Sequence, residues 1–343
     1  AFPPQQRARA LALFAAVTGL ATVGGPLIGG AVSEGLAWQW IFWLNVPIGA
    51  VLVPLVRARV PESRGQARPL DYLGLALASA AAFGAVWGLV RGNEAGWTSP
   101  EVTAALLLSA VSAAGFVRWQ RRAQAPLIPL RLFGSRAFSA GNAVGFLMTA
   151  TTFAGAFFFT QFLQVVLHYG ALGAGMRIAP WTVTLFLVAP IVGKRLDRTG
   201  ERPLASIGML MVAVGFGWIA AIANAELTWL GMVVPFVLAG VGVSMTIPAA
   251  QSAVLRAVPV EMAGAASGTY NTVRQLGGAF GIAVPAAVFG AVGGLGSAQE
   301  FSDGFRAALA TAAVLALAGA LIAALIPTRT PAPPAQVPVA VDA

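Results

Sequence analysis

The feature that most restricts the fold of this chain is a series of long apolar segments separated by short connectors. Ten such segments follow one another, near residues 10–32, 41–57, 72–91, 102–118, 139–166, 175–193, 204–224, 229–250, 264–292 and 305–326. Their lengths suit α-helices that cross the hydrocarbon core of a bilayer, which takes roughly 20 residues. Only 10% of the residues are charged, whereas about a quarter are charged in an ordinary soluble domain. We therefore expect an all-α integral membrane protein with ten transmembrane helices.

The basic residues are concentrated on alternate connectors between these segments. Seventeen of the 21 lysines and arginines lie before the first segment, in the second, fourth, sixth and eighth connectors, or in the C-terminal tail. In membrane proteins such a bias in short loops marks the cytoplasmic side. We therefore expect a multi-pass protein of the cell membrane, with both termini of this chain in the cytoplasm. The net charge of +9 then reflects topology, and we expect no nucleic-acid partner.

Residues that would support catalysis or metal binding are scarce in this sequence. The chain has no cysteine and one histidine, His168, which falls in a predicted outer connector. One imidazole without acids or cysteines does not make a zinc site. An integral membrane enzyme would need clustered acids or histidines at an interface, and the connectors contain no convincing cluster. We therefore expect no catalytic residues, no metal site and no enzymatic activity.

The first apolar segment contains the glycine-rich stretch VGGPLIGG at residues 23–30. A phosphate-binding loop would continue with Lys and then Ser or Thr, whereas this stretch continues with alanine and valine. Gly25 and Gly29 are four residues apart, so they lie on one helix face where a neighbouring backbone can come close, and Pro26 bends the helix. Generic helix packing is the alternative. The glycines and proline at Gly24, Gly25, Pro26, Gly29 and Gly30 resemble the fifth-helix motif of antiporters in the major facilitator superfamily, although the upstream glycines of that motif are alanines here.

A second motif of the same superfamily lies in the sixth connector, GKRLDRTGERP at residues 193–203. It resembles the superfamily's cytoplasmic loop motif at Gly193, Asp197, Arg198, Gly200 and Arg202. Glu201 departs from the motif because it places an acid where a base is usual. The carboxylate of Asp197 can face the positive N-terminus of the following helix. The resemblance implies a latch that acts in the transport cycle; the alternative is a basic loop that only sets topology.

The chain also repeats itself, which indicates how its helices are grouped. PQQRARALA is followed about twenty residues later by GGPLIGGAV, and PVEMAGAAS from Pro259 is followed by GGAFGIAV from Gly277. Helices that repeat at matching places in two halves are expected of transporters. If the first segment is the fifth helix of one half of a transporter and the ninth is its counterpart in the second half, the last six segments form one complete six-helix half. The first two segments are then the last two helices of the other half, and the third and fourth are an inserted pair.

This layout resembles that of the fourteen-helix drug:proton antiporters of the EmrB/QacA type, apparently without their first four helices. Further resemblances are WQWIFWLNVPIG near residues 38–49, DYLG at 71–74 and NTVRQLGGAFG at 271–281. Four parts are expected on this basis: the last two helices of the N-terminal half, the inserted pair with its cytoplasmic loops, the complete C-terminal half and a disordered Pro/Ala-rich tail. Their ranges are 1–57, 58–138, 139–326 and 327–343.

The resemblance implies that the full-length protein exports drug-like or antibiotic small molecules by proton antiport. It would need no cofactor, would be driven by the proton gradient, and would have a small amphipathic substrate, protons and the lipid bilayer as its partners. A carrier for another small solute within the superfamily is an open alternative. So is a native ten-helix metabolite exporter, although the repeats here are spaced for a six-helix half. The sequence does not indicate the substrate or the oligomeric state.

Polar residues inside the apolar segments are the best markers of a transport cavity, because each is costly in lipid. Phe153, Phe157, Gln161 and Gln164 are spaced by four, four and three residues, so they share one helix face that can hold an aromatic compound. Contacts with lipid and with a neighbouring helix explain the same face equally well.

Arg274 falls about ten residues into the ninth segment, roughly 15 Å deep at 1.5 Å per residue. An arginine at the centre of a span costs on the order of 3 kcal/mol, so we expect Arg274 to face the bundle with a partner there. Asn271 is its neighbour and a candidate for the same cavity. No Asp or Glu lies well inside any of the ten segments. We therefore expect Arg274 to have a coupling or structural role, with a carbonyl, a substrate or an acid from another helix as its partner.

Overall fold

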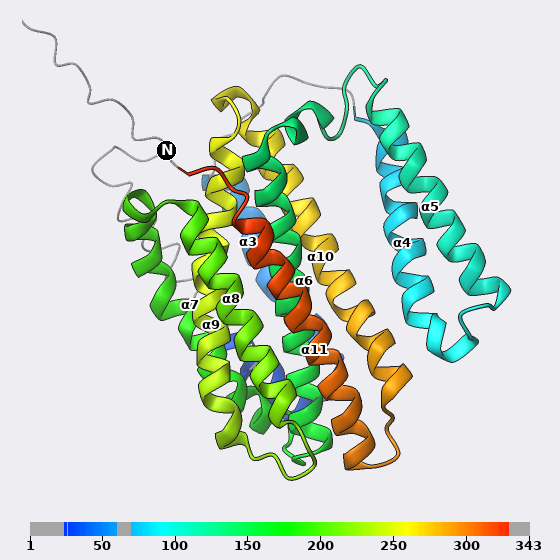
Figure 1. The fold of residues 1–343 in the computed structure, drawn as a ribbon, viewed down its shortest axis with the longest axis vertical. Coiled ribbons are helices and arrows are strands. Elements are labelled where there is room, and N and C mark those ends of the chain that lie inside the picture. The colour runs from blue at the N-terminus through cyan, green and yellow to red at the C-terminus, as the bar shows by residue number, and fades with distance from the viewer. Residues whose placement is uncertain (1–23, 26, 60–69, 329–343) are drawn as a thin grey trace, which may run out of the picture.

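The computed structural model describes residues 24–25, 27–59 and 70–328, and over these ranges the chain is built of helices and connectors (Figure 1). The helices, in chain order, are α2 (Trp40–Trp43), α3 (Asn45–Arg59), α4 (Tyr72–Ala95), α5 (Pro100–Gln120), η1 (Leu130–Gly134), α6 (Arg136–Val165), α7 (Ala171–Thr199), α8 (Glu201–Ile222), α9 (Trp229–Arg256), η2 (Val260–Met262), α10 (Ala263–Val292) and α11 (Ala298–Ala323). Residues 24–25 and 27–35 are also helical.

Nine helical stretches of the described residues are long and apolar enough to cross a membrane, and they coincide with the second to the tenth predicted segments. The first predicted segment, 10–32, lies mostly outside the described residues. The all-α membrane fold expected from the sequence is confirmed. Several helices extend beyond their apolar segments: α7, for example, covers Ala171–Thr199 where 175–193 was predicted. The hydropathy pattern ends where charged residues begin, whereas the backbone hydrogen-bond ladder continues into the interface.

The span Trp40–Arg59, which corresponds to the second predicted segment, is interrupted between α2 and α3 at Leu44. Pro47 follows in the first turn of α3, and its ring nitrogen has no hydrogen to donate to a carbonyl of the preceding turn. The side-chain amide of Asn45 donates instead to the carbonyl oxygens of Ile41, at 3.1 Å, and Phe42, at 3.4 Å. The break is therefore a local consequence of the NVP sequence.

Helices α6 to α11 pack into one bundle of six (Figure 1). Helix α6 lies against α9, α10 and α11, while α8 lies between α9 and α11. The core of this bundle is aromatic: the ring centroids of Phe159 and Phe236 are 4.6 Å apart, and those of Phe162 and Phe305 are 4.4 Å apart. All four side chains are fully buried. This bundle is the complete six-helix half expected from the sequence.

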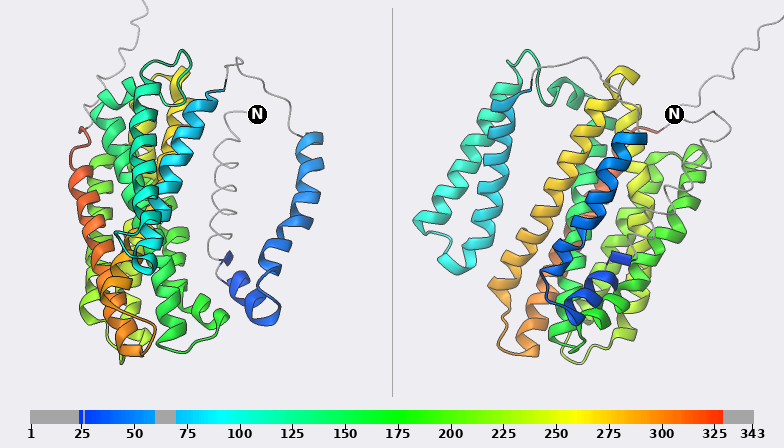
Figure 2. Two further views of the ribbon diagram at one scale, coloured as in Figure 1. Left: turned by 90° about the vertical axis from the view of Figure 1, so that its right-hand side faces the viewer. Right: turned by 180° about the vertical axis from the view of Figure 1, so that it is seen from behind.

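Helices α4 and α5 form an antiparallel pair beside the bundle (Figures 1 and 2). The pair is tight because Gly84 faces the backbone of α5, where a Cβ atom would lie 2.6 Å from the carbonyl oxygen of Ala105. The hydroxyl of Ser109 also donates to the carbonyl oxygen of Ala81 at 2.7 Å. The pair meets the bundle through α4 and α10, where the amide of Asn93 donates to the carbonyl oxygen of Ala287 at 2.6 Å.

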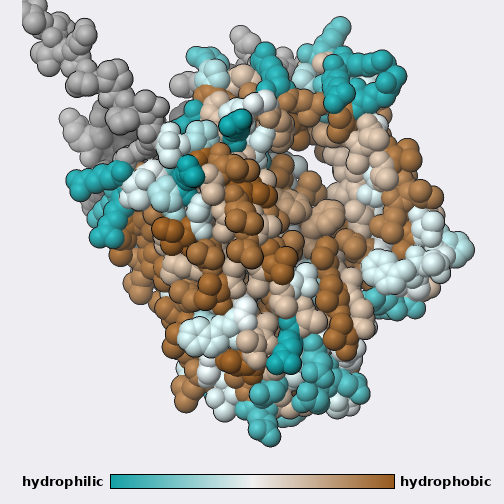
Figure 3. Space-filling model, viewed as in Figure 1, coloured by the Kyte–Doolittle hydropathy of each residue, from teal (hydrophilic) through white to brown (hydrophobic). Residues whose placement is uncertain are grey.

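Helix α3 stands apart from the other described helices, with which it has no substantial contact except α2 (Figure 2). None of its residues is buried. In the space-filling view the sides of the molecule are mainly hydrophobic and the two ends carry most of the hydrophilic residues (Figure 3). This is the surface expected of a protein surrounded by a bilayer.

The basic connectors lie at one end of the molecule. The upper end in Figure 1 contains the end of α11 and the connectors 121–135, 200 and 257–262. The lower end contains the connectors 96–99, 166–170, 223–228 and 293–297. The alternation of charge along the sequence therefore corresponds to two ends in space. Which end faces the cytoplasm remains a prediction, as do the boundaries of the four predicted parts.

Candidate functional site

A cavity of about 340 Å³ lies between the helix of residues 27–35, α2, α6 and α7. This volume is at the lower end of the range for small-molecule sites. The cavity joins one of the helices assigned by the repeat to the N-terminal half with two helices of the complete half. Its lining residues are Gly29, Gly30, Ser33, Ile41, Ala156, Thr160, Gln164, Ala171, Gly175, Ile178, Trp181 and Thr182.

Two nitrogen donors in this cavity lack a partner among the described residues. The indole N–H of Trp181 has no hydrogen-bond partner there, and the residue is buried, with 3% of its surface exposed. The side-chain amide of Gln164 is exposed and also makes no hydrogen bond there. The hydroxyl of Thr160, in contrast, donates to the carbonyl oxygen of Ala156 at 2.7 Å. A buried donor without an acceptor costs about 1–3 kcal/mol, so Trp181 marks where a ligand or water with acceptor atoms would bind, and the exposed amide of Gln164 is a second donor in the same lining.

Only one of the four residues predicted to form a binding face on α6 lines this cavity. Gln164 does so, whereas Phe153 and Phe157 are 44% and 38% exposed on the same side of the helix. The ring of Phe153 lies over Gly278 of α10, where a Cβ atom would be 3.4 Å from the ring. Gln161 is half-buried and is not part of the cavity lining. The proposed role of this face in holding an aromatic compound stays a prediction.

Trp181 and Glu34 are site residues that the sequence pattern did not reveal. Trp181 is one of nine tryptophans, and nothing in its local sequence separates it from those at the membrane interface. Glu34 is not part of the lining but follows Ser33, which is, and its carboxylate accepts a hydrogen bond from the backbone N–H of Leu172 at 2.9 Å. This N–H belongs to the first turn of α7, where a carboxylate is favoured by the free N–H groups and the helix dipole.

The glycine motif of the first segment has one residue in close contact with a neighbouring helix. A Cβ atom on Gly30 would lie 2.7 Å from the carbonyl oxygen of Ala171, so only glycine fits there. Gly25 and Gly29 have no described atom within 4 Å of such a position, and a Cβ atom on Gly24 would meet only Ile28 of its own helix, at 3.6 Å. Pro26 lies outside the described residues. The packing role predicted for Gly25 and Gly29 therefore stays a prediction.

The glycines of the repeated stretch in α10 do make close helix contacts. A Cβ atom would lie 2.2 Å from the carbonyl oxygen of Phe146 at Gly277, and 2.0 Å from that of Ala150 at Gly281. Both oxygens belong to α6, so α6 and α10 are in backbone contact along this face. The internal repeat thus places small residues where two helices of one half touch.

Arg274 lies next to this contact, near Tyr270. Its Nε atom is buried and has no hydrogen-bond partner among the described residues, and the same is true of the hydroxyl of Tyr270. Asn142 and Thr149 of α6 each have one further buried oxygen without a partner. Tyr270 is buried, whereas Asn271, the residue predicted to share a cavity with Arg274, is exposed. The structure places several polar groups between α6 and α10 whose hydrogen bonds are not completed by the described chain.

The cytoplasmic loop motif lies where α7 turns into α8. Gly200 has φ +83°, a left-handed conformation that glycine adopts without strain, and it ends α7 and precedes α8. Arg198 and Arg202 are exposed and a Cβ atom at Gly193 would meet nothing within 4 Å. Asp197 is in the last turn of α7, and its side chain lies outside the described part of the structure.

Glu201, the departure from the loop motif, makes the most specific contacts of the motif region. Its carboxylate is buried, accepts a hydrogen bond from the hydroxyl of Ser252 at 2.9 Å, and lies 3.3 Å from Nε of Arg256. Both partners are on α9. The acid therefore joins the start of α8 to the end of α9, and its basic partner comes from another helix. The sequence marks Glu201 as unusual but cannot identify this partner.

A six-helix half, an inserted helix pair and a cavity between the halves are the features of a membrane transporter of the major facilitator type. Residues 1–282 match the sequence profile of the Major Facilitator Superfamily. The chain therefore belongs to this superfamily of transporters and is not an enzyme. The nucleoside transporter NupG has a similar solved structure, with a TM-score of 0.51 and 13% identity over 91% of this chain and 90% of that one; this likeness supports the fold alone.

Similar sequences include named exporters from several bacteria. The chain is 31% identical over 288 residues to the tetracenomycin C resistance and export protein of Streptomyces glaucescens, and 32% identical over 286 residues to the multidrug export protein EmrB of Escherichia coli. Each alignment covers 82% of this chain, and 53% and 56% of the relative. The multidrug resistance protein Stp of Mycobacterium tuberculosis is 31% identical over 85% of this chain and 54% of its own length. The chain thus spans about half the length of these relatives.

Proposed function

We propose that this chain is part of a cell-membrane exporter that moves small amphipathic, drug-like or antibiotic molecules outward in exchange for protons. The relatives named as export and multidrug resistance proteins support the class of substrate. The distribution of basic connectors supports an orientation with both described ends of the bundle, at Arg136 and Ile326, in the cytoplasm. A carrier for another small solute of the same superfamily is the alternative.

The observation that carries this proposal is the cavity between the helix of residues 27–35 and helices α6 and α7. Most of its lining is apolar, and the buried N–H of Trp181 and the exposed amide of Gln164 are donors without a partner among the described residues. Sites for drug-sized ligands combine such walls with a few polar groups that orient the ligand. The cavity also lies where the two repeat units meet, which is where transporters of this kind bind their substrates.

We propose that Arg274 takes part in coupling without being the group that carries the proton. Guanidinium stays charged throughout the accessible pH range, so it cannot itself release a proton. It can stabilise a nearby group in its deprotonated state, and the incomplete hydrogen bonding of Arg274 and Tyr270 leaves room for such a group or for substrate. An Arg274→Gln protein should therefore bind a fluorescent substrate but lose export driven by a pH gradient.

The proposed function is tested by dye export from cells that express the chain from its genomic locus, together with any coding sequence that adjoins it. Trp181→Phe keeps the aromatic ring and removes the N–H, and Gln164→Leu removes the amide; each should lower the affinity for an exported dye by about fivefold to tenfold. Trp218→Phe is the matched control, because Trp218 is 45% exposed and is not part of the cavity lining. Equal effects of Trp181→Phe and Trp218→Phe would argue against this cavity. Absence of dye export by a well-expressed wild type would favour another solute.

A further inference from the structure

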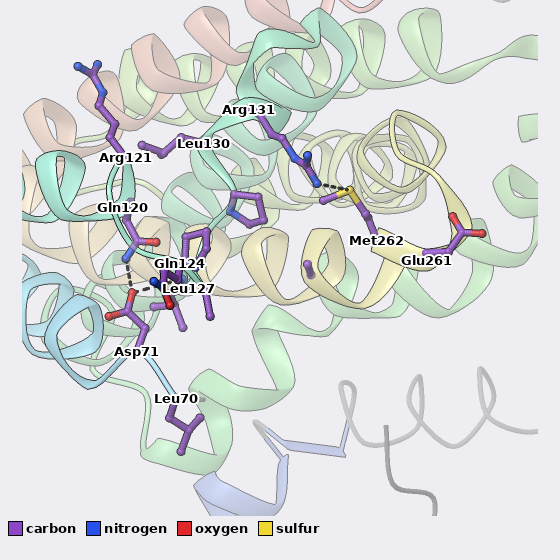
Figure 4. A pocket seen from close by; sticks show the side chains of 14 residues that line it. Leu70, Asp71, Gln120, Arg121, Gln124, Leu127, Leu130, Arg131, Glu261 and Met262 are labelled. Atoms are coloured by element: carbon purple, nitrogen blue, oxygen red, sulfur yellow. Dashed lines mark hydrogen bonds between the residues drawn. The ribbon is translucent and has the colours of Figure 1, made fainter. Parts of the chain in front are cut away.

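A second and larger cavity, of about 1040 Å³, lies between the inserted helix pair and the bundle at the end that carries the basic connectors (Figure 4). Its walls come from the residues just before α4, the end of α5, the connector that leads to η1, η1 itself, η2 and the start of α10. The lining residues are Leu70, Asp71, Gln120, Arg121, Gln124, Ala125, Pro126, Leu127, Pro129, Leu130, Arg131, Glu261, Met262 and Ala265. None of them belongs to the site proposed for the exported substrate.

Asp71 holds one wall of this cavity in place. Its carboxylate accepts hydrogen bonds from the indole N–H of Trp119 at 2.6 Å, from the side-chain amide of Gln120 at 2.6 Å, and from the backbone N–H groups of Gly74 at 2.8 Å and Leu127 at 3.3 Å. Burial alone would raise the pKa of Asp71, but these four hydrogen bonds outweigh it and hold the pKa below its ordinary value. Asp71 is therefore an occupied structural acceptor that joins both helices of the pair to the connector.

The two arginines of the cavity are not neutralised by the described chain. Arg131 contacts the sulfur of Met262 at 3.7 Å, which is a weak interaction, and neither it nor Arg121 forms an ion pair with a described carboxylate (Figure 4). The connectors on this side, residues 57–71 and 118–136, contain nine arginines and only two acidic residues. These connectors are therefore strongly basic, although the cavity lining itself also contains the carboxylates of Asp71 and Glu261, and that of Asp71 already accepts four hydrogen bonds.

The cavity also opens sideways toward the lipid. Helices α4 and α10 meet at Asn93 and Ala287, near the opposite end, and diverge towards the basic end (Figures 1 and 2). In the space-filling view an opening separates the helix pair from the bundle just below the hydrophilic cap, with mainly hydrophobic surfaces on both sides (Figure 3). The surfaces on both sides of this opening are therefore apolar enough to contact an acyl chain.

We propose that this cavity is a binding site for an anionic phospholipid of the cytoplasmic leaflet. The phosphate would be held at the rim by Arg131, and by Arg121 once its side chain turns inward from the outward direction seen in Figure 4, and an acyl chain would fill the opening between α4 and α10. Basic pockets between transmembrane helices on the cytoplasmic side bind anionic headgroups in this way. The bound lipid would then support the inserted helix pair, which contacts the bundle mainly through α4 and α10.

The test is native mass spectrometry of the purified chain in detergent, titrated with phosphatidylglycerol or with phosphatidylcholine of the same acyl chains. The wild type should retain phosphatidylglycerol with at least fivefold preference. The double variant Arg121→Gln, Arg131→Gln should lose this preference, with about a fivefold reduction in affinity for each arginine removed. Ala265→Trp changes no charge but fills the cavity, and it should reduce retention of phosphatidylglycerol as well.

The matched control is Lys194→Gln, Arg195→Gln, which removes two exposed positive charges at the same end of the molecule but outside the cavity. It should retain the wild-type preference. A wild type without preference for phosphatidylglycerol would overturn the proposal. The same loss of preference for phosphatidylglycerol in the control double variant would also overturn the proposal, because the effect would then come from net charge. A normal preference in Ala265→Trp would exclude the acyl chain from the opening.

Discussion

The six-helix bundle and the span Trp40–Arg59 differ greatly in burial although both are strongly apolar. In the most apolar stretch of α6, 56% of the residues are buried inside the structure, whereas the figure for Trp40–Arg59 is 0%. Helix α6 also contains the aromatic core residues Phe159 and Phe162, and α3 exposes Val51 and Leu52 on its surface. Within the described chain, the two regions therefore use the same kind of side chain for different purposes.

The difference shows that hydrophobicity places a helix in the membrane but does not determine its partners. In lipid, leucine gains little by moving from acyl chains to another helix, so association depends on close packing and on polar contacts. The bundle has both, in the glycines of α10 against α6 and in the ion pair of Glu201 and Arg256. Within the described chain, α3 has neither. Substitutions that remove these contacts should therefore affect the bundle strongly and α3 hardly at all.

Gly281→Leu should have the largest effect, because a side chain there would overlap the backbone of Ala150. We expect the bundle to lose at least about 3 kcal/mol, enough to prevent folding of most molecules. The measurement is the monodisperse fraction of detergent-extracted protein in size-exclusion chromatography. Gly268→Leu is the control on the same helix, since nothing lies within 4 Å of a Cβ atom at Gly268. Equal yields of the two variants would show that α10 can move away from α6.

For the glycine motif of the first segment we expect the opposite result, namely a loss of export without a loss of folding. Gly29 lines the smaller cavity and has free space around it, so Gly29→Leu should leave folding intact and fill part of the cavity. Export of a dye should fall while the extracted protein remains monodisperse. Gly25→Leu should act in the same direction if Gly25 packs against a helix outside the described residues. Wild-type export by both variants would contradict the proposed role of the motif.

Leu163→Ala and Leu52→Ala compare the two regions directly. Leu163 is fully buried in the bundle, and its truncation should cost about 2.5 kcal/mol, at the low end for buried leucines because lipid is as apolar as the core. Leu52 is 49% exposed on α3, and its truncation should change stability by less than about 0.5 kcal/mol. Thermal unfolding of both variants in one detergent measures the difference. A comparable loss in Leu52→Ala would reveal that α3 has a packing partner.

Glu201→Ala should have a smaller effect, about 1.5 kcal/mol, because the partner Arg256 is half-exposed and partly screened. Glu201→Arg would introduce the base that is usual in this loop motif, yet it should be worse than alanine since it places a second positive charge beside Arg256. Ser252→Ala removes only one hydrogen bond and should cost least of the three. Melting temperatures of the three variants provide the ranking. A stable Glu201→Arg protein would mean that the loop can adopt the usual motif arrangement here.

Asp71→Asn should have the smallest effect on the bundle and should loosen only the helix pair. The pKa of Asp71 is lowered from its ordinary value of 3.8, so its contribution is present above that value and is lost as the pH falls through the lower pKa of the folded state. The wild type should therefore keep one distance between the pair and the bundle from pH 8 to pH 5. Spin labels on single cysteines in α5 and α8 can measure this distance, since the chain has no cysteine of its own. Asp71→Asn should show a broader distance distribution at every pH. A sharp change of this distance near pH 6 in the wild type would contradict the role assigned to Asp71.

Much of the architecture could be predicted from the sequence because the membrane imposes it. A run of apolar residues must form a helix in lipid, where no water can satisfy the backbone, and the basic connectors alternate because loops alternate between two sides. The spans from Trp40 to Ala323 and the grouping of α6 to α11 therefore agree with the predictions. The break before Asn45 could have been expected from Pro47, but its effect on the helix was not read from the sequence.

The candidate site was less predictable because it depends on contacts between helices that are far apart in the chain. Gln164 was recognised by its polarity inside an apolar segment, whereas Trp181 looks like any other tryptophan until α7 is placed beside α6. The glycine repeat indicated close packing, but only the arrangement of helices shows that Gly277 and Gly281 make it, and that Gly30 contacts α7. In the same way, the sequence marks Glu201 as an exception without indicating Arg256.

The sequence by itself thus determined the class of protein, the positions of the spans and the side of the bundle on which the arginines gather. These properties depend on each residue's preference for lipid or water, which is local and additive along the chain. The tertiary structure decided which glycines touch a backbone, which donors remain unpaired in a cavity, and how Asp71 joins the two helices of the inserted pair to the connector that follows them. These properties depend on distances between helices, because packing and hydrogen bonding act only over a few ångströms and the sequence does not specify which surfaces come within that range.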